Sequence, residues 1–227
     1  MDVLITGCDT DLGRTIAQSF AQAGHDVILA AARRQELEVL AKELDVSDGR
    51  TIAVDNGDPQ ALAAAQAQFP AHLDTVVNVP AATWQGGDPR AFTLADHATQ
   101  WRHMFDSGLV AAMLTVQVLG DQLRSGGSII TVVPEPTTEG SAGAAVKAAI
   151  SDWTAGQAHH FGIRGITVNA VAAGRGYEPG YDSLGAADSP TVSDEIARLS
   201  LFLTTPAARH ITGQTLHVSH GALAHFG

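Results

Sequence analysis

Short runs of apolar and β-branched residues alternate with longer alanine-rich segments along the whole chain. This alternation is typical of βαβ units, in which parallel strands form one sheet and the intervening helices cover it. Several runs are continuously apolar, as expected for strands that are buried on both faces. We predict strands at 3–6, 26–31, 51–55, 75–78, 128–133, 167–171 and 215–218, and helices at 12–24, 34–45, 58–69, 95–121, 142–161 and 192–204.

The length and composition favour one α/β domain that spans residues 1–227. A chain of 227 residues with 45% hydrophobic residues can bury a full core, and no shift in composition indicates a second domain. Only 5% of the residues are aromatic, so we expect a core of Ala, Val, Ile and Leu. Residues 172–190 are interrupted by glycine and proline and form one long predicted loop, a type of segment that is usually functional or mobile.

Charge and cysteine usage exclude several classes of function. The formal net charge of −11 disfavours binding to nucleic acid. No apolar run approaches the roughly 18–20 residues that span a bilayer, and the chain runs from Met1 directly into a strand, so we expect neither membrane insertion nor a signal peptide. A single cysteine precludes an internal disulfide and fits a reducing compartment, so we expect a cytoplasmic protein.

A set of ordered motifs resembles the short-chain dehydrogenase/reductase family. Residues 4–14, LITGCDTDLGR, resemble its Thr-Gly-xxx-Gly-x-Gly turn. The match continues, in the family's order, through DNGD at 55–58, VNVPA at 77–81, GSII at 127–130, ITVNAVAAG at 166–174 and ITGQTLHV at 211–218. The resemblance covers essentially the whole chain. It implies a Rossmann-like doubly wound parallel sheet of about seven strands with helices on both faces.

The resemblance places the phosphates of a dinucleotide at Gly7 and Gly13, where glycines let the backbone approach the pyrophosphate at a helix N-terminus. The middle glycine of the family's turn is Asp11 here. A carboxylate about 5 Å from a phosphate costs roughly 3 kcal/mol at an effective dielectric constant near 20. Alternatively, Asp11 caps or charges the first helical turn and takes the electrostatic place of the phosphate.

Arg33 and Arg34 follow the second predicted strand, where family members that prefer NADP carry a basic residue. No acid stands at the family's usual ribose position, so the resemblance favours NADP over NAD. Two other interpretations stay open at this stage. The arginines are solvated at a helix start, or Asp9 or Asp11 pairs with one of them and fills the 2′-phosphate site from within.

Three more positions match cofactor contacts of the family. Asp55 matches the acid beside adenine, Asn78 opens the segment that follows the fourth predicted strand, and Lys147 matches the lysine that holds the nicotinamide ribose. The residues after Asn78, VPA, depart from the family's Asn-Ala-Gly and lose its glycine. We interpret Cys8 as a small residue that fills the loop rather than as an activated thiol.

The catalytic residues of the family are largely missing. Its tyrosine, a general acid/base, falls at Gly143, its serine at about 133–134 and its asparagine at Gly108, so only Lys147 remains. A positioned general acid typically contributes about 10²–10⁴-fold, and glycine cannot supply it. The only tyrosines, Tyr177 and Tyr181, lie in the predicted loop, where they either substitute for the acid or close a pocket.

Other side chains near the expected catalytic end suggest non-catalytic roles. Glu135 or Glu139 could pair with Lys147 and neutralise it, and Ser107 could hold a water beside the lost asparagine position. The ten histidines show no ligand spacing, because His159 and His160 diverge by about 100° on a helix and no cysteine pairs accompany them. We therefore expect no metal site.

Two main hypotheses follow. In the first, the protein is a degenerate family member with weakened or lost dinucleotide binding and a binding or assembly role. In the second, it is an NADP(H)-dependent oxidoreductase of a small carbonyl or alcohol substrate with a non-standard proton donor, such as Tyr177, Tyr181, a substrate group or water. A non-redox enzyme is a weaker third option. Members of the family usually associate, and the small residues at 142–161 allow helices to approach closely, so we expect a homodimer or homotetramer.

Overall fold

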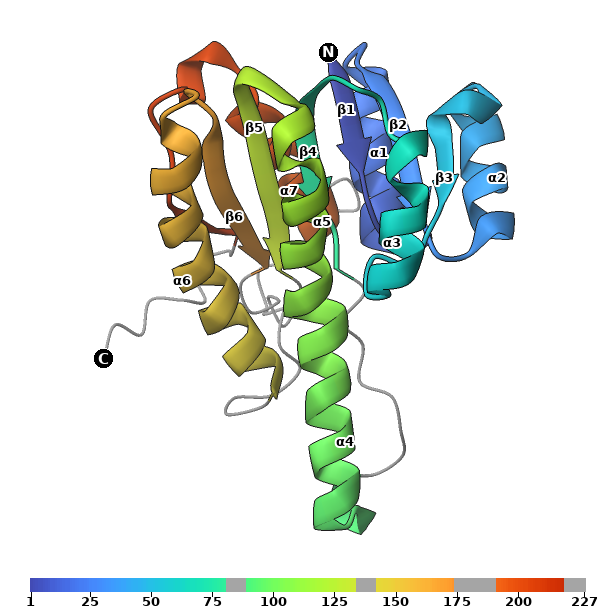
Figure 1. Cartoon of the computed structure of the whole chain (residues 1–227), viewed down its shortest axis with the longest axis vertical. Helices are drawn as coiled ribbons and strands as arrows, with labels where there is room; N and C mark the ends of the chain where they lie inside the picture. Colours follow the sequence, from blue (N-terminus) through green and yellow to red (C-terminus); the bar gives the residue numbers. More distant parts are fainter. Residues whose placement is uncertain (81–88, 134–141, 174–190, 219–227) are drawn as a thin grey trace, which may run out of the picture.

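The structure is a computed structural model that describes residues 1–80, 89–133, 142–173 and 191–218. In these residues, seven parallel strands form one sheet of order β3-β2-β1-β4-β5-β6-β7 (Figure 1). The strands are β1 Asp2–Ile5, β2 Asp26–Ala31, β3 Thr51–Ala53, β4 Leu73–Asn78, β5 Leu123–Val133, β6 Thr167–Ala173 and β7 Thr215–Val218. The α-helices are α1 Asp11–Gln22, α2 Arg34–Glu43, α3 Pro59–Ala65, α4 Leu94–Phe105, α5 Ala111–Leu119, α6 Ala142–Gly162 and α7 Val192–Leu203.

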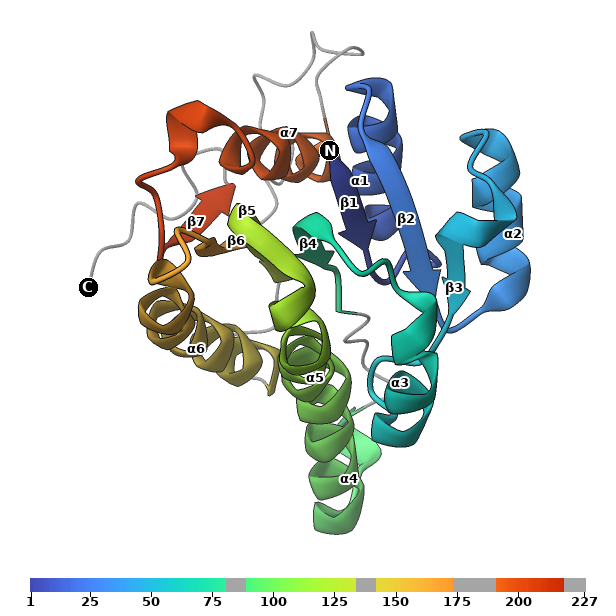
Figure 2. The same cartoon turned by 45° about the horizontal axis from the view of Figure 1, so that its top comes forward.

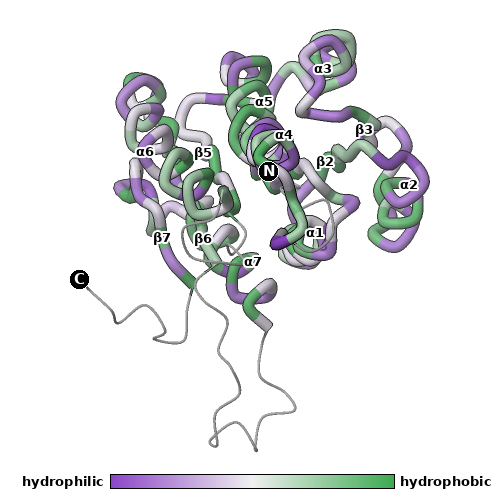
Figure 3. Tube along the Cα trace, turned by 90° about the horizontal axis from the view of Figure 1, so that it is seen from below, coloured by the Kyte–Doolittle hydropathy of each residue, from purple (hydrophilic) through white to green (hydrophobic). Residues whose placement is uncertain are grey.

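Helices cover both faces of the sheet (Figure 2). Successive residues of a strand point to opposite faces, so β1 sends Val3 and Ile5 to one core and Leu4 to the other. The first core contains buried residues of α1, α2 and α7, and the second contains residues of α3, α5 and α6. Figure 3 shows the hydrophobic colour on the central strands and on α5, with hydrophilic residues recurring on α3. The predicted doubly wound α/β fold is confirmed.

Every predicted strand and helix is present, and most of the differences lie at the ends of the elements. β5 begins at Leu123 rather than at 128, because the polar sequence Arg-Ser-Gly-Gly at 124–127 hides its first half. The predicted helix 95–121 is divided by a π-helical turn, Asp106–Val110, between α4 and α5. In the predicted loop 172–190, the first two residues belong to β6, and 174–190 lie outside the described residues.

The expectation that the chain does not insert in a membrane stays a prediction, although one helical stretch has the length and composition of a membrane helix. The helical stretch Leu94–Gln122 is long and apolar enough to cross a membrane by length and composition alone. Polar residues interrupt this stretch, so it contains no continuous apolar run of 18–20 residues. This is weak evidence for a membrane span, since the core helix of a soluble protein passes the same test. In its second half, Val116 and Leu119 are buried against the sheet, whereas α4 projects beyond the sheet and has no buried residue (Figure 1).

The turn between β1 and α1 is built on two glycines and a threonine. Gly7 has a φ of +62°, and a Cβ at this position would lie 2.0 Å from the carbonyl oxygen of Val79. A Cβ on Gly13 would lie 2.1 Å from the carbonyl oxygen of Gly7. The Thr10 hydroxyl caps α1 by accepting from the Gly13 N–H, and it donates to the Gly7 carbonyl at 2.8 Å. The turn therefore has no room for side chains at its glycines.

We expect Gly7→Ala to lower the free energy of unfolding by about 2 kcal/mol or more, because it adds a steric collision to an unfavourable φ. Gly24→Ala is the matched control. Gly24 also has a positive φ, +80°, but a Cβ added there would have nothing within 4 Å. We expect Gly24→Ala to lower the free energy of unfolding by only about 1 kcal/mol. Urea titration monitored by circular dichroism measures both values, and equal losses would contradict the close-packing argument.

Candidate functional site

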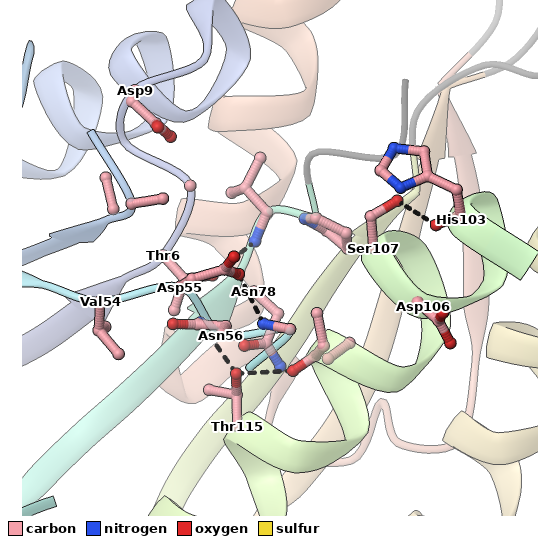
Figure 4. A pocket seen from close by; sticks show the side chains of 18 residues that line it. Thr6, Asp9, Val54, Asp55, Asn56, Asn78, His103, Asp106, Ser107 and Thr115 are labelled. Carbon is pink, nitrogen blue, oxygen red and sulfur yellow. Dashed lines mark hydrogen bonds between the residues drawn. The ribbon is translucent and has the colours of Figure 1, made fainter. Parts of the chain in front are cut away.

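A crevice with about 240 Å³ of open volume lies at the carboxyl ends of the central strands (Figure 4). Its walls come from the segments that follow β1, β2, β3 and β4, and from α4, the π-helical turn and α5. The strand order reverses between β1 and β4, and ligands of open α/β sheets bind at this switch point. The fold thus provides a ligand crevice where the sequence placed the dinucleotide.

Asp11, which stands at the middle glycine position of the turn, does not face this crevice. Asp11 is exposed in the first turn of α1 and is not among the residues that line the crevice. The hypothesis that Asp11 caps the helix is wrong, because Thr10 is the N-cap residue. The hypothesis that Asp11 charges the first helical turn agrees with its position, where a carboxylate interacts favourably with the helix dipole.

Asp9, in contrast, lines the crevice and binds Arg33. One Asp9 carboxylate oxygen accepts from the Arg33 backbone N–H at 3.2 Å and from its Nε at 3.0 Å. The Arg33 Nη2 donates to the Asp9 carbonyl, and its Nη1 donates to the Glu36 carboxylate. These bonds raise the pKa of Arg33, chiefly through the hydrogen bond with Asp9. The open possibility that Asp9 pairs with one of the two arginines is confirmed.

The segment after β3 forms the next part of the crevice wall. Asp55 accepts the backbone N–H of Gly57 at 2.9 Å, which makes it a turn residue as well as a crevice residue. The Asn56 side chain donates to the Thr115 hydroxyl at 2.9 Å, and this hydroxyl donates to the Ala111 carbonyl (Figure 4). This bond joins the β3 end to α5. The sequence gives no local signal for the Asn56–Thr115 pair, because the two residues are 59 positions apart.

Asn78, the last residue of β4, is the most unusual polar side chain of the crevice. It is only 1% exposed, yet neither its Nδ2 nor its Oδ1 has a hydrogen-bond partner in the described part of the chain. A buried polar group that lacks a partner costs about 1–3 kcal/mol. An amide with a donor and an acceptor at the wall of a crevice is therefore suited to bind a polar ligand there.

The other end of the crevice lies along α4 and the π-helical turn. Gly108, which the resemblance matches to the family's asparagine, is buried within this turn, and π-turns are frequent at functional sites. Ser107 donates to the His103 carbonyl at 2.8 Å, four residues earlier, so its hydroxyl is bonded within its own helical stretch. The His103 Nε2 is buried, with no hydrogen bond to any residue that the structure describes. Sequence analysis did not select His103, because a lone histidine on a helix carries no signal.

The expected catalytic end is only partly described. Gly143 lies in the first turn of α6, and Lys147 follows one turn later and is half-buried. Partial burial and the Lys147 ammonium both lower the pKa of His217, so this lysine lies near the carboxyl end of β7. Tyr177, Tyr181, Glu135 and Glu139 lie outside the described residues, and the predictions on them stay predictions.

The single cysteine and the possible metal ligands were the remaining candidates for reactive chemistry. The Cys8 side chain is fully buried and donates to the Ile5 carbonyl, and burial raises its pKa to about 12. The interpretation of Cys8 as a residue that fills the loop is confirmed. Among the described residues, no three His, Cys, Asp or Glu side chains gather in a way that could hold a metal ion.

Comparisons with known proteins agree with this architecture. Residues 8–222 match the family model described as enoyl-(acyl carrier protein) reductase. Rv1856c of Mycobacterium tuberculosis, whose name assigns it to the oxidoreductases without a substrate, is 59% identical over all 227 residues of both chains. Protein FixR of Bradyrhizobium diazoefficiens is 30% identical over 96% of this chain and 85% of its own. A short-chain dehydrogenase of Burkholderia cenocepacia, solved in complex with NADP, has a TM-score of 0.76 at 27% identity, over 97% of this chain and 96% of its own.

We expect Asn78→Leu to raise the free energy of unfolding by about 1 kcal/mol and to weaken binding of ligands in the crevice. Leucine has a similar shape but no polar atoms to leave without partners. Thermal melting and ligand titration of the same preparation give both quantities. A variant that is less stable than the wild type would show that the Asn78 amide has a structural role instead.

Proposed function

Because this chain belongs to the short-chain dehydrogenase/reductase family, we propose that it binds a nicotinamide dinucleotide in the crevice but does not catalyse the tyrosine-dependent carbonyl reduction of its family. Two features together carry the proposal: an open crevice at the switch point of the sheet, and a glycine at position 143. The first provides a binding site. The second removes the acid that the family's reaction needs.

Three observations support binding. The turn at Gly7 and Gly13 keeps its backbone close to the end of β4, as a pyrophosphate site requires. The buried amide of Asn78 faces the crevice with both of its polar atoms unsatisfied in the described structure. The related dehydrogenase of Burkholderia cenocepacia was solved in complex with NADP. No described side chain fills the crevice, which argues against the complete loss of ligand binding.

The argument against tyrosine-dependent reduction rests on α6. Gly143 and Lys147 lie four residues apart and therefore on the same face of this helix. The resemblance assigns the family's lysine to Lys147, but residue 143 is a glycine and has no side chain that could donate a proton. The Lys147 ammonium would then contact a ribose hydroxyl rather than tune the pKa of a tyrosine.

One observation favours the second candidate function, NADP(H)-dependent reduction of a small carbonyl substrate with a non-standard acid. His103 lines the crevice, and its Nε2 is buried without a partner in the described residues. An imidazolium there could give a proton to a substrate carbonyl while the reduced nicotinamide gives the hydride.

Fluorescence titration with NADH and NADPH, up to millimolar cofactor, tests the proposal. We expect the wild type to bind at least one of them and to turn over no carbonyl in a panel of ketones and aldehydes. Ala32→Phe is the blocking control, because Ala32 lines the crevice but is exposed, so phenylalanine fills the site without disturbing the core. Absence of binding would overturn the proposal. Turnover that His103→Gln abolishes would establish the second candidate instead.

We also propose that the chain forms a homodimer or homotetramer through the helical stretch 94–122 and α6. Support comes from α4, where the side chains of Leu94 and Trp101 are 89% and 49% exposed. We expect light scattering to give two or four times the 23.5 kDa of one chain, and Trp101→Glu to reduce this mass. Phe202→Glu, which changes an exposed aromatic residue on α7, is the control that should leave the mass unchanged. A monomeric wild type would contradict the proposal.

A further inference from the structure

Asp9 holds a position between two elements that border the crevice. It follows the first glycine of the β1–α1 turn, and its carboxylate is 9% exposed. It reaches across to the start of α2, where it accepts from the backbone N–H of Arg33 at 3.2 Å. This N–H belongs to the N-cap residue of a ten-residue helix, an end that attracts anions. The chain's own carboxylate thus occupies this anion position.

The Arg33 guanidinium is engaged by Asp9 and Glu36 through all three of its nitrogens. Its Nε donates to the Asp9 carboxylate at 3.0 Å, its Nη2 donates to the Asp9 carbonyl, and its Nη1 donates to the Glu36 carboxylate. One guanidinium is therefore shared by two carboxylates, and the cluster has a net charge of about −1 before any ligand arrives. A phosphate group would have to displace Asp9 or Glu36 to gain the arginine.

The rest of the crevice has the same sign of charge. Asp9, Asp55 and Asp106 line it, and none of the lining residues that the structure describes is Lys or Arg. Asn78 is the independent indication of a ligand, because its buried amide is without a partner in the described structure and belongs to the crevice wall. A carboxylate accepts hydrogen bonds from hydroxyl groups but repels a phosphate dianion. The site is therefore suited to the diol of a ribose rather than to a phosphorylated ribose.

We propose that Asp9, held by Arg33, makes the adenosine end of the crevice selective for the unphosphorylated dinucleotide, NAD(H), over NADP(H). The inference rests on the dinucleotide binding proposed above and names which cofactor binds. In the sequence, Arg33 alone indicates a preference for NADP over NAD. The structure supports the opposite preference, because Asp9, 24 positions earlier, engages the guanidinium that would bind a 2′-phosphate.

The test compares NADH and NADPH affinities of the full-length protein by fluorescence titration at fixed ionic strength. We expect the wild type to bind NADH at least about tenfold more tightly than NADPH, because a carboxylate beside a phosphate weakens binding, by roughly a hundredfold when they are about 5 Å apart. Asp9→Asn keeps the shape but removes the charge and releases Arg33, so the ratio should shift toward NADPH by about tenfold or more. Asp9→Ser serves as a second variant if the asparagine variant folds poorly.

Asp106→Asn is the matched control, because it removes a carboxylate from the other end of the same crevice (Figure 4). It should leave the ratio of the two affinities unchanged. A wild type that binds NADPH as tightly as NADH, or an Asp9→Asn variant with an unchanged ratio, would overturn the inference and leave the proposed dinucleotide binding intact. If neither the wild type nor the Asp9 variants bind either cofactor, both proposals fail.

Discussion

The contact between the β1–α1 turn and the end of β4 is the constraint on which the crevice depends. Gly7 packs directly on the carbonyl of Val79, and the Val79 N–H donates to the Thr6 hydroxyl at 3.1 Å. These contacts join two strands that are neighbours in the sheet but more than 70 residues apart in the chain. They fix the point at which the strand order reverses. Because helices cover both faces of the sheet, the open space remains at the strand ends.

The polar groups around this space have different functions. Thr10 caps a helix, Asn56 joins a strand end to α5, and Asp9 binds Arg33. Each of these groups has its hydrogen bonds within the chain. Asn78 has none in the described residues, although it is nearly fully buried. Asn78 therefore differs from the side chains that hold the crevice together, and its amide is suited to bind a ligand.

Residue 143 is the position on which the proposed lack of the family's usual reaction depends. The fold, the glycine turn and Lys147 agree with a dinucleotide-binding protein, whereas Gly143 provides no proton donor. A fold can keep its binding site while the reacting groups change, because the two depend on different residues. Binding and turnover therefore need separate measurements in this protein.

The sequence by itself determined the seven strands, the order of helices between them and the family, because hydrophobic periodicity and glycine spacing are local properties of the chain. It also determined that position 143 has no acid. Only the tertiary structure decided which of the acidic residues near the glycine turn faces the crevice. Asp9 and Asp11 are two residues apart, but the start of α1 turns Asp11 to solvent and leaves Asp9 beside Arg33. The pairing of Asp9 and Arg33 depends on the parallel alignment of β1 and β2, which brings the residues after both strands to one edge of the sheet.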